Sequence, residues 1–271
     1  MCQRATTLAL ALIAALLLVA CGGSAAEPEP RTDGAAAQTA APSAPASTGE
    51  AEPLLAAGER VVFIGDSLGL QAPPNYPDLL PGELGERAPG VETVNLSESG
   101  TTTADWAPGS PLFEERLGPE LDDADVVAVT LGGNDLQETL GAGDGLDALA
   151  AGPDAAADAL RGIERSGRRL GRIFDEIRSR APSARVVYVG YPDYSEATAW
   201  RERGGTLAIA ALSLGLSALV DAAADADPDL LIDMREPTAR AGVDSLLADS
   251  EHLSVAGHEL YARRLAAQLT R

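Results

Sequence analysis

The sequence predicts an α/β fold in which about five parallel strands lie between two layers of helices. Three observations predict it: short apolar runs recur along residues 56–271, helical stretches separate them, and the runs contain few polar residues. Strands that alternate with helices pair in parallel through right-handed crossovers. Apolar strands without alternation indicate a sheet that is covered on both faces. We therefore expect one three-layer α/β/α domain over these residues.

Each apolar run has the length of a strand and is bounded by turn residues. The predicted strands cover residues 60–65, 91–96, 125–131, 184–189 and 229–233. Large apolar residues at spacings of three, four and seven predict a helix over residues 155–180, and a second follows over 205–224. The last helix is expected over residues 255–269, with Ser254 as its N-cap.

The chain before residue 56 is expected to lie outside the domain. Residues 1–20 hold Arg4 and an apolar run that is too short to span a bilayer, which predicts a signal peptide. The small residue before Cys21 resembles the lipobox of bacterial lipoproteins. This resemblance implies cleavage before Cys21, its lipidation, and export to the outer face of the cell membrane. An uncleaved anchor or an ordinary signal are the alternatives.

Residues 21–55 are rich in Ala, Pro and Ser and contain almost no large apolar residues. A segment of this composition cannot bury a core, so we expect a disordered tether between the lipidated Cys21 and the domain.

Composition excludes several classes of function. The chain has 20 basic residues against 41 acidic ones, and its formal net charge is −21. Phosphate binding needs a basic surface, so we expect no nucleic-acid partner and no charge-driven membrane binding. Two His and two Cys leave little material for a metal site or a disulfide framework. The expected protein is a monomer that meets the membrane only through its lipid anchor.

The residues that suggest chemistry follow the strands, where ligands bind in parallel sheets. The first strand ends in Gly65-Asp66-Ser67-Leu68-Gly69. Ser67 at a strand-to-helix turn would lie near the positive end of the helix, which suits a nucleophile. The stretch also matches the G-x-S-x-G elbow of α/β-hydrolases, and a plain helix cap is the alternative.

Gly100 follows the second predicted strand and can bring a backbone N–H close to a substrate oxygen. Asn134 follows the third and can donate its amide N–H to a developing oxyanion. Ordinary turns explain both positions equally well. Asp66 and Asp135 are expected to fix turns rather than to react.

A serine mechanism must use one of the two histidines. Asp249 lies three residues before His252, so its carboxylate can accept from Nδ1–H and leave Nε2 for Ser67. His258 lies inside the last predicted helix and is interpreted as structural. Asp244 and Glu251 are alternative partners for His252.

These four blocks, in this order, resemble the SGNH hydrolases, also called the GDSL esterase and lipase family. The blocks contain Ser67, Gly100, Asn134 and His252, and the resemblance runs from Arg60 to the C-terminus. It implies a flavodoxin-like SGNH hydrolase fold and disfavours the α/β-hydrolase elbow, because Asp and His are so close in sequence.

The resemblance further implies a serine esterase that forms an acyl-enzyme without a metal or an organic cofactor. Ser67, His252 and Asp249 would be the catalytic triad. The backbone N–H groups of Ser67 and Gly100, with the Asn134 side chain, would form the oxyanion hole.

The substrate stays open. Short acyl, O-acetyl and lipid esters, on small molecules or glycans, all fit a surface-tethered esterase. An acyltransferase, a thioesterase or lysophospholipase, and a non-catalytic surface binding module are the alternatives. Trp106, Leu136, Tyr191 and Trp200 are candidate walls of the substrate site, although the two Trp residues would serve equally well as packing residues.

Overall fold

A computed structural model describes residues 53–70, 73–140, 153–203 and 206–271. The predicted signal peptide, Cys21 and most of the predicted tether lie outside these residues. Among the described helices, none has the length and apolar character needed to cross a bilayer.

A five-stranded parallel sheet forms the centre of the domain, as predicted. Its strands are β1 (Arg60–Gly65), β2 (Glu92–Asn95), β3 (Val126–Thr130), β4 (Arg185–Val189) and β5 (Leu230–Ile232). They lie in the order β2-β1-β3-β4-β5. All four pairings are parallel, so the carboxyl ends of the strands share one edge of the sheet.

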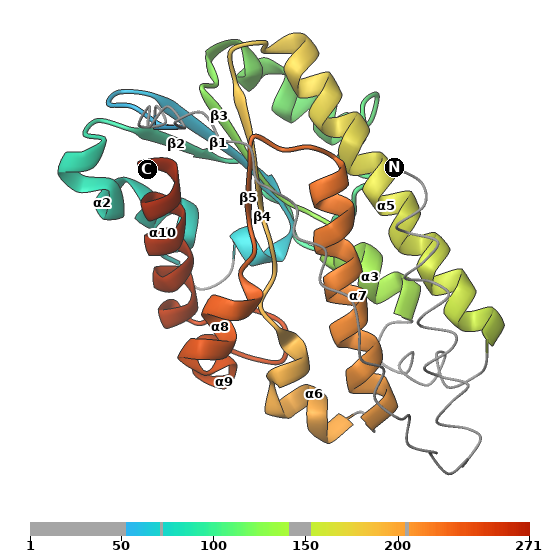
Figure 1. The fold of residues 1–271 in the computed structure, drawn as a ribbon. Helices are drawn as coiled ribbons and strands as arrows, with labels where there is room; N and C mark the ends of the chain where they lie inside the picture. Colours follow the sequence, from blue (N-terminus) through green and yellow to red (C-terminus); the bar gives the residue numbers. More distant parts are fainter. Residues whose placement is uncertain (1–52, 71–72, 141–152, 204–205) are drawn as a thin grey trace, which may run out of the picture. The chain divides into compact units, whose positions relative to one another are not determined.

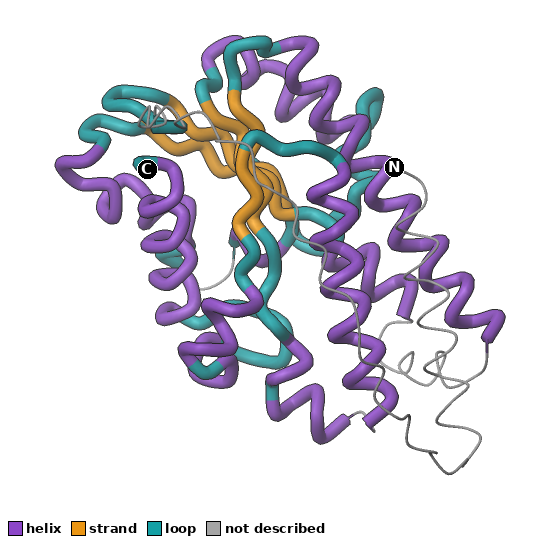
Figure 2. The backbone as a smooth tube through the Cα atoms, viewed as in Figure 1, coloured by secondary structure: helices purple, strands orange, loops and turns teal. Residues whose placement is uncertain are grey.

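Helices cover both faces of the sheet, which confirms the three-layer architecture. Figure 1 shows α2 (Tyr76–Leu84) and α10 (Val255–Leu269) on one side. It shows α5 (Pro153–Arg180) and α7 (Thr206–Asp225) on the other. Figure 2 shows the same layers, with the strands between helices. The last helix has the predicted N-cap, because Ser254 Oγ accepts from the Gly257 N–H at 3.3 Å.

Alternating residues of β1 build the two halves of the core. Val61 and Phe63 join a first apolar cluster, in which Phe63 packs edge-on against Tyr76 with ring centroids 5.7 Å apart. Val62 and Ile64 face the other way and join a second apolar cluster. Burial on both faces explains why β1 has no polar alternation.

The remaining helices are short and were not predicted, because few residues in each carry a helical pattern and tertiary packing decides their conformation. The α-helices are α3 (Gly133–Leu140), α6 (Thr198–Arg203), α8 (Arg235–Ala241) and α9 (Val243–Leu246). Shorter or irregular helical segments are η1 (Ser67–Gly69), η2 (Gly85–Arg87), η3 (Leu112–Leu117), η4 (Gly118–Asp123) and η5 (Tyr194–Glu196).

The domain begins earlier than the predicted boundary at residue 56. Leu55 is buried in the first apolar cluster, and its N–H donates to the Leu269 carbonyl at 3.0 Å. The Leu54 carbonyl accepts from the Arg185 guanidinium. The expectation that the tether extends to residue 55 is therefore wrong, because the two leucines at its end pack against the domain.

Candidate active site

Ser67 lies at the turn that follows β1. Gly65 ends this strand, and a Cβ at Gly65 would lie 2.8 Å from the Thr130 carbonyl oxygen, so only glycine allows the close approach to β3. Asp66 then caps η1, with its Oδ1 accepting from the Leu68 N–H at 2.9 Å. This cap sets Ser67 at the first position of the helical turn, where its side chain is partly exposed.

A closed loop between α9 and α10 carries His252. The Ala248 N–H donates to the His252 carbonyl at 2.8 Å, and Leu247 pairs with Leu253 in an antiparallel bridge. Within the loop, Asp249 Oδ1 accepts from the backbone N–H of His252, also at 2.8 Å. The loop therefore holds aspartate and histidine in a fixed relation to each other.

Two consecutive contacts connect Asp249 to His252 and His252 to Ser67. Asp249 Oδ2 lies 2.8 Å from His252 Nδ1, and His252 Nε2 lies 3.2 Å from Ser67 Oγ. A carboxylate only accepts, so Nδ1 carries a proton, and Nε2 of a neutral ring can then accept from the Ser67 hydroxyl. This arrangement can withdraw a proton from Ser67.

Asp249 is held in its ionised form. Burial raises its pKa, but hydrogen bonds from the His252 side chain and from the backbone N–H groups of Glu251 and His252 outweigh burial and lower it. The alternative partner Asp244 accepts instead from the N–H and hydroxyl of Thr198, at 2.8 and 2.6 Å. Of the three carboxylates considered, Asp249 is the one whose side chain bonds to His252.

Thr101 ties the other two sequence blocks to the turn of Ser67. Gly100 has φ +78°, a conformation that favours glycine. Next to it, the Thr101 hydroxyl lies 3.0 Å from the Gly65 carbonyl, and the Thr101 carbonyl accepts from Asn134 Nδ2 at 2.8 Å. The amide group of Asn134 has a second N–H, so the contact orients the group and leaves it able to donate again.

Buried Asp135 holds the same loop from the other side. Its carboxylate accepts from the Thr103 N–H at 2.8 Å, from the Thr103 hydroxyl at 2.6 Å and from the Ser166 hydroxyl at 2.8 Å. Asp135 thus fixes a turn, as expected. Thr101, Thr103 and Ser166 were not predicted from the sequence, and the only local signal for them is the Thr101-Thr102-Thr103 run after Gly100.

Three of the four candidate wall residues belong to the core. Trp106 has no exposed surface, and its Nε1 donates to Thr101 Oγ1 at 3.0 Å, so the expectation that it lines a substrate site is wrong. Leu136 and Tyr191 are only 4% and 5% exposed and join the first apolar cluster. Trp200 is half-buried and donates to the Ser250 carbonyl at 2.7 Å, beside the His252 loop.

His258 lies in the core and not beside Ser67. Its side chain is fully buried, and Nδ1 accepts from the Tyr76 N–H at 3.2 Å, which satisfies a donor at the start of α2. The ring also stacks on Tyr76, with centroids 6.1 Å apart. These contacts agree with a structural role.

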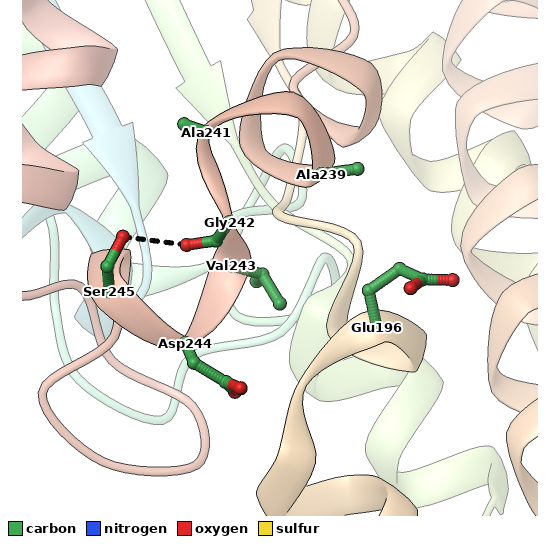
Figure 3. A pocket seen from close by; sticks show the side chains of 7 residues that line it. All are labelled: Glu196, Ala239, Ala241, Gly242, Val243, Asp244 and Ser245. Atoms are coloured by element: carbon green, nitrogen blue, oxygen red, sulfur yellow. Dashed lines mark hydrogen bonds between the residues drawn. The ribbon is translucent and has the colours of Figure 1, made fainter.

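A separate cavity of about 360 Å³ lies between η5 and the α8–α9 segment (Figure 3). Its two acidic side chains are engaged, Asp244 with Thr198 and Glu196 with Arg201. None of the predicted site residues lines it. The lining residues are Glu196, Ala239, Ala241, Gly242, Val243, Asp244 and Ser245. Within the described part of the chain, no three His, Cys, Asp or Glu side chains are grouped to hold a metal ion.

Asp66 is a buried carboxylate directly beside the nucleophile turn. Burial raises its pKa from 3.8 to about 6, against the lowering effect of hydrogen bonds from the Tyr191 hydroxyl and the Leu68 N–H. The nearby charge of Asp135 raises the pKa further, and that of His252 lowers it. Asp66 therefore changes charge in a pH range where most carboxylates stay ionised.

This shift predicts a pH-dependent stability. Between its ordinary pKa and about 6, Asp66 holds a proton more often in the folded state than in the unfolded state, so the free energy of unfolding falls as pH rises. Asp66→Asn keeps the size of the side chain and an acceptor for the Leu68 N–H, presents an N–H to Tyr191 in place of the second acceptor, and removes the titration. We expect the free energy of unfolding of the variant, measured with urea and taken relative to that of the wild type, to rise by up to about 3 kcal/mol from about pH 4 to about pH 7. The same difference between variant and wild type at pH 4 and at pH 7 would contradict the prediction.

The solved structures that resemble this domain share its fold. An extracellular lipase from Streptomyces rimosus superposes with a TM-score of 0.57 at 21% identity, over 78% of this chain and 99% of that chain. An acetylxylan esterase from Geobacillus stearothermophilus gives a TM-score of 0.57 at 19% identity, over 80% of this chain and 96% of that chain. The flavodoxin-like α/β architecture is confirmed by these neighbours.

Comparison of sequences identifies a related lipase and the family of this chain. A lipase from Streptomyces rimosus is 31% identical over 169 residues, which cover 60% of this chain and 54% of the relative. The chain thus spans about half the length of the curated lipase that it matches. The model of the GDSL-like lipase/acylhydrolase family matches residues 63–260, which include Ser67, Gly100, Asn134 and His252. Because this match covers most of the chain, the protein belongs to the GDSL-like lipase/acylhydrolase family, as the four sequence blocks predicted.

Proposed function

We propose that this protein is a serine esterase that hydrolyses carboxylic esters through an acyl-enzyme. The observation that carries the proposal is the line of contacts from Asp249 to His252 to Ser67, at 2.8 and 3.2 Å. Membership in a family of lipases and acylhydrolases supports the same reaction class.

In the first half of the reaction, Ser67 Oγ attacks the ester carbonyl while His252 Nε2 takes its proton. Negative charge then develops on the carbonyl oxygen. The backbone N–H groups of Ser67 and Gly100 and the Asn134 amide would donate to it, each such donor being worth about 10²–10³ in rate. When the tetrahedral intermediate collapses, His252 gives the proton to the leaving alcohol, and the acyl group stays on Ser67.

The second half repeats these steps with water. His252 takes a proton from the water that attacks the acyl-enzyme, and then returns it to Ser67 Oγ as the acid leaves. Throughout, ionised Asp249 orients the ring and stabilises the imidazolium that forms twice in each cycle. Asp249 contributes through its pairing with Nδ1, and it stays a carboxylate.

The substrate class is proposed only broadly, as short acyl, O-acetyl or lipid esters. The neighbours support this breadth, since they include a phospholipase A1 from Streptomyces albidoflavus beside the acetylxylan esterase and the lipase. With three of the candidate wall residues in the core, Trp200 is the remaining candidate for contact with the substrate.

Replacement of the nucleophile tests the reaction. We expect Ser67→Ala to lower kcat on p-nitrophenyl esters by about 10³-fold or more, because the variant lacks the hydroxyl that is paired with His252 and would carry the acyl group. Ser99→Ala is the matched control, since Ser99 is exposed and lies beside Gly100. Hydrolysis is measured on p-nitrophenyl esters of different acyl length and on acetylated glycans. Equal loss of activity in both variants would refute the role of Ser67.

The same assays are repeated with an added alcohol acceptor, and acylated acceptor among the products would indicate acyl transfer.

Asp249 is distinguished from its neighbour by a second pair of variants. Asp249→Asn keeps the size of the side chain but no longer favours a protonated Nδ1, so we expect kcat to fall by about 10²–10⁴-fold. Glu251→Gln should leave kcat within about twofold, because only the backbone of Glu251 contacts the loop residues. The measurement is steady-state hydrolysis of p-nitrophenyl acetate. If Glu251→Gln had the larger effect, the assignment of Asp249 would be wrong.

The protein is further proposed to be exported, cleaved before Cys21 and lipidated there, so that a tether holds the esterase at the outer face of the membrane. The support is the sequence alone, through the apolar run over residues 5–20 and the small residue before Cys21. Expressed in bacteria, the wild type should enter the detergent phase of a Triton X-114 extract, and mass spectrometry should find a diacylated N-terminal cysteine. Cys21→Ala should lose both signals. An unmodified Cys21 in the membrane fraction would contradict lipidation.

A further inference from the structure

We infer that Tyr191 and Asp66 form a positioning pair that holds the nucleophile turn and the Asn134 turn in register. This inference rests on the proposed function of Ser67 and Asn134. It gives Tyr191 a role behind the site rather than in its wall.

A hydrogen bond joins the two side chains directly. Tyr191 Oη donates to Asp66 Oδ2 at 2.6 Å, while Asp66 Oδ1 accepts from the Leu68 N–H at 2.9 Å. Asp66 and Tyr191 are 3% and 5% exposed. Water therefore competes little for these bonds, and the carboxylate connects the end of β4 to the residues on either side of Ser67.

Tyr191 also contacts the other turn. Tyr191 packs so closely against Gly133 that a Cβ at Gly133 would lie 2.6 Å from Cε1 and 3.1 Å from the hydroxyl oxygen of Tyr191. Gly133 immediately precedes Asn134. One tyrosine thus packs against the turn of the proposed oxyanion donor and donates to the cap of the nucleophile turn.

The charge of Asp66 also acts on His252. Ionised Asp66 attracts a positively charged His252, and this is the state of His252 after it takes the Ser67 proton. Asp135, at the start of α3, is the other acidic group that acts on Asp66. The tyrosines around it stay neutral in the working pH range, because burial raises the pKa of each; they are Tyr76 on α2, Tyr188 and Tyr191 at β4, Tyr194 on η5 and Tyr261 on α10. Loss of the Asp66 charge should therefore slow the attack of Ser67.

The test measures the second-order rate of Ser67 labelling by a fluorophosphonate between about pH 5 and pH 9. This probe needs an activated serine and no knowledge of the natural ester. Tyr191→Phe should label about tenfold more slowly at pH 8, since it loses a hydrogen bond to a charged group. The pH at which its rate falls on the acid side should rise by about one unit, because the lost bond lowers the pKa of Asp66 in the wild type.

Two further variants separate positioning from general stability. Tyr261→Phe removes a buried hydroxyl that donates to the Gly190 carbonyl at 3.0 Å, next to Tyr191, and leaves the Tyr191–Asp66 hydrogen bond in place. Its labelling rate at pH 8, and the pH at which that rate falls on the acid side (the acid limb), should match those of the wild type. Asp66→Asn keeps the size of the side chain but loses the charge and the acceptor for the Tyr191 hydroxyl, so it should label more slowly at pH 8. It should also lose the decrease in labelling rate at low pH that protonation of Asp66 causes.

The outcomes distinguish this inference from the proposed function. A wild type that labels no faster than Ser67→Ala would overturn both. Labelling that depends on Ser67, with Tyr191→Phe matching Tyr261→Phe in rate and acid limb, would overturn the positioning pair alone. Should Tyr191→Phe fail to fold, Asp66→Asn decides: labelling at the wild-type rate with the wild-type acid limb would overturn the inference.

Discussion

The contact between His252 Nε2 and Ser67 Oγ joins two residues that are 185 positions apart in the sequence, and the proposed chemistry depends on it. No single helix, strand or turn contains both residues, so the tertiary fold brings them together. Ser67 stands at the end of β1, while His252 lies on a loop between α9 and α10. The helix that follows the His252 loop, α10, packs against α2, which follows the Ser67 turn, on the face of the sheet that Val61 and Phe63 build. A change in this packing would act on the site from a distance.

The parallel sheet explains why a few side chains are enough to build the proposed active site. All strands deliver their carboxyl ends to one edge, so the turns after β1, β2 and β3 meet without long loops. Polar contacts then lock these turns together. Thr101 links the turn after β2 to Gly65 and to Asn134, and Asp135 holds Thr103. Tyr191 donates to Asp66 and packs against Gly133. Buried hydrogen bonds of this kind make the site rigid before any substrate arrives.

Much of this could be predicted from the sequence, for physical reasons. Parallel strands that are buried on both faces consist of consecutive apolar residues, so the strand that ends at Gly65 and the strand before Gly132 could be recognised. The pairing of Asp249 with His252 was predictable because three residues of chain suffice to bring them together. The supporting network was not predictable. Thr101, Ser166 and Tyr191 act through contacts between elements that are distant in sequence, and no local spacing marks them. For the same reason the sequence left two roles open for Trp106, since a scarce aromatic residue suits a core as well as a binding site, and the structure shows the core role.

The most direct measurement is the intact mass of the purified protein after treatment with a fluorophosphonate, followed by mapping of the modified peptide. The account predicts one adduct, on the peptide that contains Ser67, and its complete loss in Ser67→Ala. An adduct that persists in Ser67→Ala, or no adduct on wild-type protein that is shown to be folded, would contradict it.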